Sequence, residues 1–316
     1  MHFIAILNRN GGTLRTMDLS AFCAEARTLF EAHGHTIDCE IVTGRQIERR
    51  LRRAAATPGV DAMIAGGGDG TISSAAGIAY ETGMALAVLP AGTMNLFARA
   101  LKMPMDLTEA LEAIAGGEIG AVDIATANGR PFVHQFGVGI HARLVRIRES
   151  MSYRSRLGKM AASLRSVAAA ALNPPVFEAE LKTRGNKAER QKVSGIAVSN
   201  NLLGDGHIPH ADKLDAGLLG IYTAAPVSTA ALIKLAAEVL MGKWRESDAV
   251  TETRVTEVTL SFPRHRRGLR AVVDGELIKL DREVRLKVHP KALKVVLPNL
   301  FWSLNRRNQR PDLTVP

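Results

Sequence analysis

Two short segments of this chain place glycines, an acid and hydroxyl side chains directly after apolar runs. Residues 66–71 read GGGDGT and residues 90–95 read PAGTMN. Each segment precedes a helical pattern, so each predicts a turn from a buried strand into a helix. Glycines let the backbone approach a ligand closely, and the start of a helix offers unpaired N–H groups and a positive dipole end. The two turns are therefore predicted to bind an anion, and a phosphate is the natural one.

These glycines spell neither of two common phosphate motifs. A P-loop requires a lysine that does not follow them, and GxGxxG would require glycine at Thr71 or Ser73. Asp69 instead places a carboxylate where phosphates are expected. A carboxylate there repels phosphate unless a divalent cation binds or a proton is to be removed, so the pattern favours phosphoryl transfer with magnesium. The alternative is a plain glycine-rich turn with a helix-capping aspartate.

Together these motifs resemble a known family. GGDGT at 67–71 with PxGTxNxFAR at 90–99 is similar to the catalytic domain of the diacylglycerol kinase family, which includes bacterial lipid kinases and the sphingosine and ceramide kinases. Further matches follow in family order: NRNGG at 8–12, Thr43, VDI at 122–124, GVGI at 137–140, LGK at 157–159, NN at 200–201 and DGE at 274–276. The resemblance implies an ATP- and magnesium-dependent lipid kinase of phospholipid biosynthesis, with conversion of diacylglycerol to phosphatidic acid as the default reaction.

The resemblance also implies roles for individual residues. Asp69, Asp274 and Glu276 are the candidate catalytic residues, which would position magnesium and take the proton from the attacking hydroxyl. Asp274 is the leading candidate for the general base. The candidate nucleotide-binding residues are Asn10, Thr43, Gly67, Gly68, Asp69, Gly70, Thr71, Gly92, Thr93 and Asn95. Asp69 and Asp215 are the candidate metal ligands.

The pattern around Asp274 has two interpretations from the residues alone. Two acids two positions apart in a strand point to one face, and the intervening Gly275 would let a ligand approach. The alternative is a surface turn between two strands.

Three positions depart from the family pattern. Leu96 stands where the family commonly has an acid that helps to organise magnesium-bound water. DAGL at 215–218 places its acid one residue early for the turn that binds a structural magnesium in some bacterial members, and His141 stands where an aspartate is often seen.

Alternatives to the default reaction therefore stay open. Within the class, the substrate could be a sphingoid base or ceramide. From another class, a weakly active or non-catalytic nucleotide- or lipid-binding regulator is the alternative. A soluble-substrate kinase similar to the NAD kinases shares the GGDG core, but the PxGTxNxFAR segment favours the lipid branch.

The elements expected around the motifs change character near Asp123. Strands at 3–7, 36–42, 62–65 and 85–89 alternate with helices that include 20–33 and 46–56, which predicts a doubly wound parallel sheet that binds ligands at the carboxyl ends of its strands. Beyond Asp123 we expect a mainly antiparallel β-sandwich with strands at 131–138, 176–182, 193–199, 218–223, 256–262, 269–273, 284–288 and 293–297 and helices near 151–172 and 228–241. The chain is thus α/β, with a nucleotide-binding kinase domain at 1–123, a β-sandwich lipid-substrate domain at 124–300 and a basic tail at 301–316.

Composition agrees with a globular protein of two domains. The 316 residues are 46% apolar and 23% charged, which is ordinary for folded domains and sufficient for two cores. The two cysteines, Cys23 and Cys39, fall in an expected helix and an expected strand, so free buried thiols in a reducing compartment are favoured. The chain begins directly with a strand rather than a signal peptide, and no apolar run is long enough to span a membrane. We therefore expect a cytoplasmic location.

The net charge of +10 indicates a polyanionic partner, such as nucleic acid or an anionic membrane surface. Nucleic acid is disfavoured, because aromatic residues are only 4% of the chain and no nucleic-acid-binding module is recognisable. Between 143 and 165, seven Arg or Lys residues stand against one Glu, and an amphipathic basic helix of this kind binds anionic lipid surfaces. A helix packed on its own domain with a solvated basic face is the alternative. We expect peripheral contact with the inner face of the membrane through basic segments, and a homodimer is one open oligomeric state.

Overall fold

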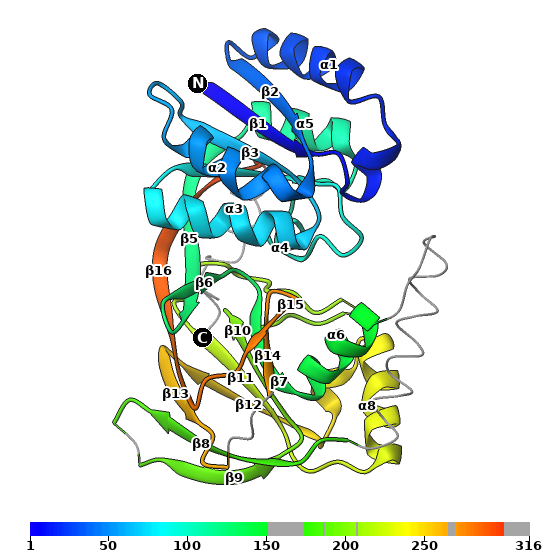
Figure 1. The fold of residues 1–316 in the computed structure, drawn as a ribbon, viewed down its shortest axis with the longest axis vertical. Coiled ribbons are helices and arrows are strands. Elements are labelled where there is room, and N and C mark those ends of the chain that lie inside the picture. The colour runs from blue at the N-terminus through cyan, green and yellow to red at the C-terminus, as the bar shows by residue number, and fades with distance from the viewer. Residues whose placement is uncertain (151–173, 186, 207, 265–268, 300–316) are drawn as a thin grey trace, which may run out of the picture. The chain divides into compact units, whose positions relative to one another are not determined.

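The computed structural model describes residues 1–316 except 151–173, 186, 207, 265–268 and 300–316 (Figure 1). The chain divides into two compact units. The first unit comprises Met1–Val122 and Lys291–Pro316, and the second comprises Asp123–Pro290. Two strands, β5 (Glu118–Ala127) and β16 (Glu283–Leu297), contribute residues to both units.

The first unit is built on a parallel sheet in the order β2-β1-β3-β4-β16. Its other strands are β1 (His2–Asn8), β2 (Thr36–Val42), β3 (Ala62–Gly67) and β4 (Ala85–Pro90). Every residue of β3 and β4 is buried, as expected for central strands that are covered on both faces. This arrangement confirms the predicted doubly wound domain.

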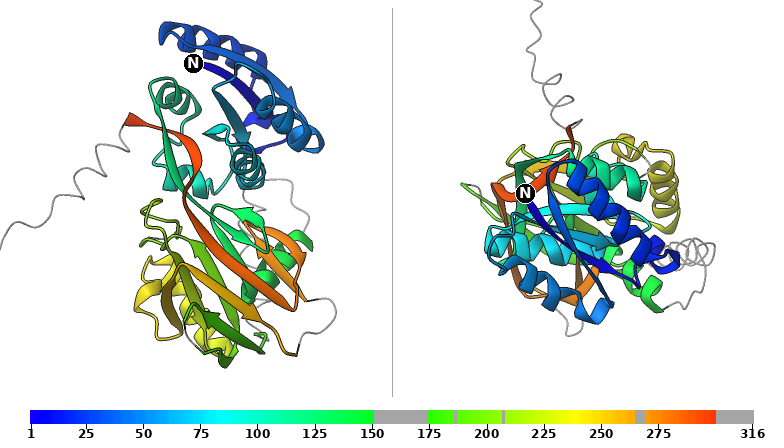
Figure 2. Two further views of the ribbon diagram at one scale, coloured as in Figure 1. Left: turned by 90° about the vertical axis from the view of Figure 1, so that its left-hand side faces the viewer. Right: turned by 90° about the horizontal axis from the view of Figure 1, so that it is seen from above.

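Helices cover both faces of this parallel sheet. They are α1 (Leu19–Ala32), α2 (Ile47–Ala55), α3 (Asp69–Thr82), α4 (Leu96–Ala100) and α5 (Leu107–Ala115), with short 3-10 helices η1 (Gly12–Thr16) and η2 (Gly44–Gln46). Helix α1 packs against β2 and α5, whereas α2 packs against α3, β1 and β3 (Figures 1 and 2). The start of α1 is fixed by Asp18 and that of α5 by Asp106, because each side chain accepts two backbone N–H bonds.

The second unit contains two antiparallel sheets. One has the order β12-β11-β10-β7-β14-β15, and the other places β16, β13, β8 and β9 side by side, with β5 next to β16 and β6 (Figure 2). The strands are β6 (Arg130–Phe132), β7 (Gln135–Gly139), β8 (Phe177–Thr183), β9 (Glu189–Val193), β10 (Gly195–Asn200), β11 (Leu219–Ala224), β12 (Val250–Val255), β13 (Glu257–Ser261), β14 (Arg270–Val273) and β15 (Glu276–Lys279). Side chains of both sheets, among them Phe136, Val198, Leu260 and Leu286, share one buried core. The predicted sandwich is therefore confirmed.

The second unit also contains α6 (Ile140–Ser150), α8 (Thr229–Leu240) and η3 (Trp244–Glu246). Helix α8 lies within the helix expected at 228–241, and Ser228 caps its first turn by accepting from the Ala231 N–H. The helix expected near 151–172 and the basic tail at 301–316 lie outside the described residues. Among the helices that are described, none is long and apolar enough to cross a membrane.

Several boundaries differ from those expected. The strand predicted at 131–138 is two strands, β6 and β7, because backbone N–H groups of residues 133–135 bond to the Asp274 side chain. The strands predicted at 284–288 and 293–297 are one strand, β16. Its end from Lys291 belongs to the first unit, where Val295 pairs with Leu86, so the second unit ends at Pro290 rather than at 300. The sequence patterns did not predict β5, β9, β12, β15 or α6.

Candidate functional site

The first glycine turn joins β3 to α3. Gly67 ends the strand, Gly68 occupies the N-cap position, and Asp69 is the first helical residue. A Cβ atom on Gly67 would lie 2.6 Å from the Thr71 hydroxyl oxygen, so this position excludes any side chain. A Cβ atom on Gly70 would meet no atom within 4 Å. The turn is thus packed against Thr71 on one side and open at Gly70. Within the first helical turn, the Thr71 N–H donates to the Gly68 carbonyl at 2.9 Å.

The second glycine turn lies against the first. A Cβ atom on Gly92 would lie 2.6 Å from the Cα atom of Gly68, so the two backbones meet at a distance that only glycine permits. Asn95 holds the turn closed: its Oδ1 accepts from the Gly92 N–H at 2.8 Å, and its Nδ2 donates to the Gly92 carbonyl at 3.2 Å. Asn95 has φ of 53°, a left-handed conformation in which asparagine is the common non-glycine residue.

The Asp69 carboxylate connects the two turns. Its oxygens accept hydrogen bonds from the backbone N–H groups of Asn95, at 3.2 Å, and Leu96, at 2.7 Å. Asp69 therefore caps a helix, as the alternative interpretation of its motif allowed, and that helix is α4, which follows the neighbouring turn. A carboxylate offers about four acceptor positions, so these two bonds leave capacity for a further donor or a cation.

A third segment at the same edge of the sheet is linked to the first turn by Asn8, the last residue of β1. The Asn8 Nδ2 donates to the Thr71 hydroxyl at 3.2 Å, and its Oδ1 accepts from the Asn10 N–H at 3.1 Å. Asn10 in turn accepts from the Gly44 N–H at 3.1 Å. Asn10 was among the predicted nucleotide-binding residues, whereas Asn8 was not. The position of Asn8 at the carboxyl end of a parallel strand was the signal that could have identified it.

Thr43 follows β2, and its side chain bonds to a residue of its own loop. Its backbone N–H and its hydroxyl both donate to Gln46 Oε1, each at 3.0 Å. The Thr43 side chain also accepts from the Gln46 backbone N–H, and this bond and the one from the Thr43 N–H form the capping box of η2. The structure thus brings the candidate nucleotide-binding residues to the carboxyl ends of β1, β2, β3 and β4. Their contacts with a nucleotide stay a prediction.

In the second unit, Asp274 and Gly275 form the tight turn between β14 and β15. Val273 pairs with Glu276, and φ is 46° at Asp274 and 85° at Gly275. Positive φ at both central residues is the hairpin turn for which Asp-Gly is a preferred sequence. The interpretation that placed Asp274 in a strand is therefore wrong, and the alternative, a turn, is correct.

The Asp274 carboxylate holds the segment between β6 and β7. It accepts hydrogen bonds from the backbone N–H groups of Val133 at 2.9 Å, His134 at 2.9 Å and Gln135 at 3.0 Å. Glu276, by contrast, lies on the surface and pairs with Arg130 at 2.6 Å. The geometry assigns Asp274 an anchoring role, and its role as general base stays a prediction.

Asp215, the second candidate metal ligand, is exposed on a loop. The next two residues are fixed from the interior: the Ala216 N–H donates to Asn201 Oδ1 at 3.2 Å, and the Gly217 N–H donates to the buried carboxylate of Asp123 at 2.6 Å. In the part of the chain that the structure describes, no group of three His, Cys, Asp or Glu side chains is placed to hold a metal ion. A metal at Asp215 stays a prediction.

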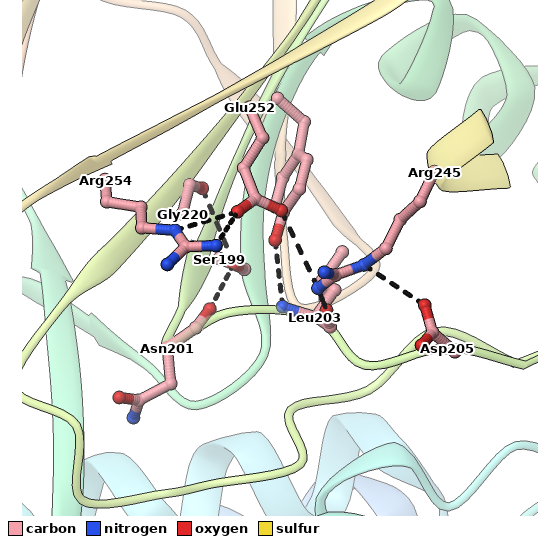
Figure 3. A network of polar contacts seen from close by, with 9 residues as sticks. Ser199, Asn201, Leu203, Asp205, Gly220, Arg245, Glu252 and Arg254 are labelled. Carbon is pink, nitrogen blue, oxygen red and sulfur yellow. Dashed lines mark hydrogen bonds and ion pairs between the residues drawn. The ribbon is translucent and has the colours of Figure 1, made fainter. Parts of the chain in front are cut away.

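The loop that leads to Asp215 is held by a polar network (Figure 3). The Tyr222 hydroxyl accepts from the Leu203 N–H at 2.9 Å, and burial raises the pKa of this tyrosine. Arg245 donates to the Leu203 carbonyl, pairs with Asp205 at 3.2 Å and lies 3.6 Å from Glu252. These contacts fix the loop against the sheet that contains β11 and β12.

Comparisons with known proteins agree with this architecture. The sequence model of the family described as "Diacylglycerol kinase catalytic domain" matches residues 2–127. The model described as "YegS C-terminal NAD kinase beta sandwich-like domain" matches residues 135–297. A solved structure titled as a putative diacylglycerol kinase from Bacillus anthracis superposes with a TM-score of 0.74 at 20% identity over 95% of this chain and 96% of that chain, which supports the shared fold.

Two relatives extend the similarity at the level of sequence. A Bacillus subtilis protein named diacylglycerol kinase is 25% identical over 85% of this chain and 90% of its own length. An uncharacterized Synechocystis protein is 28% identical over 80% of this chain, which spans 59% of that relative's length. The resemblance drawn from the glycine motifs is thereby confirmed. The chain belongs to the lipid kinase family in which a diacylglycerol kinase catalytic domain is followed by a YegS C-terminal β-sandwich-like domain.

Proposed function

We propose that the protein transfers the γ-phosphoryl group of ATP to a lipid hydroxyl, with diacylglycerol as substrate and phosphatidic acid as product. The observation that carries this proposal is the contact between the two glycine turns, with the Asp69 carboxylate bound to the start of α4. Passive phosphate binding needs no acid at this position, whereas phosphoryl transfer does. Family membership supports the same reaction class.

The nucleotide phosphates would bind at the open side of the first glycine turn. Gly70 leaves this side uncovered, and the positive dipole end of α3, which begins at Asp69, would favour an anion there. Asn10 and Thr93 would add polar contacts from the neighbouring segments. The Thr43 hydroxyl would have to exchange its bond to Gln46 for a nucleotide oxygen, so its contribution is smaller than the motif suggested.

Magnesium fits the residues that are present. Mg²⁺ is commonly held by one or two carboxylates together with substrate phosphates and water, and Asp69 keeps acceptor capacity beyond its two backbone bonds. When bound, the ion would neutralise negative charge on the transferring phosphoryl group. In this chain, Leu96 replaces the acid that is common in the family. Asp69, which accepts from the Leu96 N–H, is therefore the carboxylate that would hold the ion.

A lipid substrate requires contact with a membrane surface, and α8 offers an apolar face for it. Ile233, Leu240 and the adjoining Met241 are 56%, 69% and 58% exposed. Lys243, just beyond this helix, is an exposed cation, which anionic lipid headgroups attract, whereas the exposed Lys234 pairs with Glu238 at 3.6 Å. We therefore include peripheral association with an anionic bilayer in the proposal.

The reaction is tested with purified protein, labelled ATP, magnesium and vesicles that contain diacylglycerol, sphingosine or ceramide. We expect label in phosphatidic acid, and removal of magnesium by a chelator should abolish it. Label in sphingosine phosphate or ceramide phosphate alone would replace diacylglycerol by the sphingoid alternative. Absence of label from every lipid would overturn the proposed function.

The membrane surface is tested separately with Leu240→Gln and Met241→Gln in one chain. We expect weaker binding to anionic vesicles and lower activity on vesicle substrate, with activity on a short-chain, water-soluble diacylglycerol unchanged. Val176→Gln is the matched control, because Val176, at 56%, is about as exposed as Met241, at 58%, and lies outside α8. Equal losses on both substrates would place α8 in the reaction itself rather than at the membrane.

A further inference from the structure

Asn8 is the last residue of β1, and both polar atoms of its side chain are hydrogen-bonded within the first unit. One of them lies 3.1 Å from the Asn10 backbone nitrogen, and the other lies 3.2 Å from the Thr71 hydroxyl oxygen. A backbone N–H can only donate, so the atom that meets Asn10 is the side-chain oxygen of Asn8. The atom at Thr71 is therefore the amide nitrogen, which can also only donate. The Thr71 hydroxyl is consequently the acceptor in this bond.

The orientation of the Asn8 amide is fixed by its own segment. Its oxygen accepts from the Asn10 N–H, and the Asn8 backbone carbonyl accepts from the Gly11 N–H at 2.8 Å. Asn10 is held in turn, because its side-chain oxygen accepts from the Gly44 N–H at 3.1 Å. Rotation of the Asn8 amide by half a turn would place its NH₂ group against the Asn10 N–H, and two donors cannot bond to each other. The observed orientation is therefore the favoured one.

The Thr71 side chain is held from two sides and keeps one free function. It stands against Gly67, where an added Cβ atom would lie 2.6 Å from the Thr71 Oγ1 and 2.9 Å from its Cγ2, and Asn8 bonds to its oxygen. In the part of the chain that the structure describes, the Thr71 hydroxyl has no acceptor for its own proton. This proton is thus available to a ligand at the first glycine turn, which is open at Gly70.

We infer that Asn8 is a positioning residue for nucleotide binding, because its amide makes the Thr71 hydroxyl an acceptor on one side and leaves its proton for a phosphate oxygen of ATP. An ionised phosphate oxygen only accepts hydrogen bonds, so a hydroxyl binds it only as a donor. Asn8 acts through Thr71 and need not touch the nucleotide itself. The inference rests on the proposed function, since it takes the first glycine turn as the site of the ATP phosphates.

Two variants of Asn8 distinguish this role from a structural one. Asn8→Asp keeps the shape of the side chain and the bond from the Asn10 N–H, but the new oxygen at Thr71 accepts the hydroxyl proton and withdraws it from the phosphate. Asn8→Ala removes both bonds and leaves the hydroxyl free to rotate. A structural role predicts that Asn8→Ala is the more damaging change, whereas a role in orienting the hydroxyl predicts that Asn8→Asp is.

The measurement is the dissociation constant of ATP with magnesium for the full chain, by isothermal titration calorimetry. We expect ATP to bind at least about tenfold more weakly to Asn8→Asp and about threefold more weakly to Asn8→Ala. The KM for diacylglycerol should stay within about twofold in both variants, because the hydroxyl contact concerns ATP alone. Thermal unfolding of each variant shows whether the fold is retained. An equal or larger loss of ATP affinity in Asn8→Ala would overturn the inference.

Thr71→Val separates the effect of the hydroxyl from that of the added charge, because valine keeps the branched shape of threonine without its hydroxyl. If Asn8 acts through Thr71, Asn8→Asp combined with Thr71→Val should bind ATP within about threefold of Thr71→Val alone. Thr71→Ser is the matched control, since it keeps the hydroxyl, and in it Asn8→Asp should again cause the full loss. Equal losses from Asn8→Asp in the valine and serine backgrounds would assign the effect to charge repulsion and overturn the inference.

Failure of this inference is distinguishable from failure of the proposed function. An unaltered chain that does not bind ATP would overturn both. An unaltered chain that binds ATP, with losses that add independently in the double variants, would overturn the inference alone. If Asn8→Asp does not fold, the combination of Asn8→Ala with Thr71→Val decides in the same way, because it should bind ATP no more weakly than Thr71→Val.

Discussion

Asp69 in the first unit and Asp274 in the second both accept hydrogen bonds from backbone N–H groups, but they differ in the number of these bonds. Asp69 is the first residue of α3 and binds two backbone N–H groups at the start of α4. Asp274 lies in a hairpin turn and binds three consecutive backbone N–H groups at residues 133–135. Asp69 connects two segments that both belong to the glycine motifs, whereas Asp274 connects segments far apart in the sequence.

The difference in the number of bonds means that the Asp69 carboxylate can still bind a cation, whereas the Asp274 carboxylate mainly stabilises the backbone around it. Two bonds leave acceptor positions on Asp69 for a cation, while three bonds occupy most of those on Asp274. We therefore assign the chemistry of phosphoryl transfer primarily to Asp69 and the positioning of β6 and β7 primarily to Asp274. Variants of these two residues and of their neighbours test this assignment.

The largest effect is expected for Asp69→Asn. Loss of the charge removes the candidate metal ligand, and turnover should fall by more than about 10²-fold. Asp106→Asn is the matched control, because the Asp106 carboxylate also accepts two backbone N–H bonds, from Thr108 and Glu109, at the start of α5. Its turnover should stay within about twofold of the unaltered protein. Similar losses in the two variants would show that Asp69 acts only as a cap.

Asp274→Ala should mainly lower stability. The change removes the acceptor of three backbone hydrogen bonds and leaves a non-glycine residue without a polar side chain at positive φ, so the free energy of unfolding should fall by about 2–4 kcal/mol. Asp274→Asn keeps one oxygen acceptor and a residue favoured in this turn, so it should lose less. The check is urea unfolding followed by fluorescence. A stable Asp274→Asn protein without turnover would assign the general base to Asp274 and reverse our comparison.

Leu96→Asp should sharpen the role of Asp69. Leu96 is only half-buried and its N–H already donates to Asp69, so a new carboxylate would lie near an existing one. Without metal, repulsion between like charges should lower the free energy of unfolding by about 1 kcal/mol. Magnesium should restore it. Leu96→Asn is the uncharged control, and its melting temperature should not respond to magnesium more than that of the unaltered protein.

The smallest effect on stability is expected for Glu276→Gln. The ion pair between Glu276 and Arg130 is solvent-exposed, with side chains 71% and 45% accessible, so its loss should change the free energy of unfolding by less than about 1 kcal/mol. Arg130→Gln removes the same ion pair from the other side. If Glu276 takes part in catalysis, turnover should fall in Glu276→Gln alone. Equal turnover in both variants would remove Glu276 from the candidate catalytic residues.

The parallel-sheet unit was largely predictable because its signals are local. Strand, glycine turn and helix follow one another in the sequence, and the candidate residues fall at the carboxyl ends of strands as expected. The contact between Asp69 and Leu96 was not predictable, because it depends on how closely Gly68 and Gly92 approach in space. Asn8 was missed for the same reason, since its partner Thr71 belongs to another turn.

The sandwich unit was predictable in class but not in detail. Alternation of apolar and polar residues identified most strands, yet the division between β6 and β7 depends on Asp274, a residue far along the chain. The end of the second unit at Pro290 could not be predicted, because β16 continues through this residue without a break. The part of β16 beyond Pro290 is assigned to the first unit by its pairing with β4, which depends on tertiary structure. The sequence DG at 274–275 contained the hairpin signal, and a turn was one of the two interpretations that the residues left open.

The most direct test of the assignment is the binding of Mn²⁺, used in place of Mg²⁺, to the protein with ATP, measured by electron paramagnetic resonance. The unaltered protein, Asp274→Asn and Asp106→Asn should each bind the Mn²⁺–ATP complex with similar affinity. Asp69→Asn should bind it at least about tenfold more weakly, because the carboxylate that would hold the ion is gone. Unchanged affinity in Asp69→Asn, with a loss in Asp274→Asn, would contradict our account.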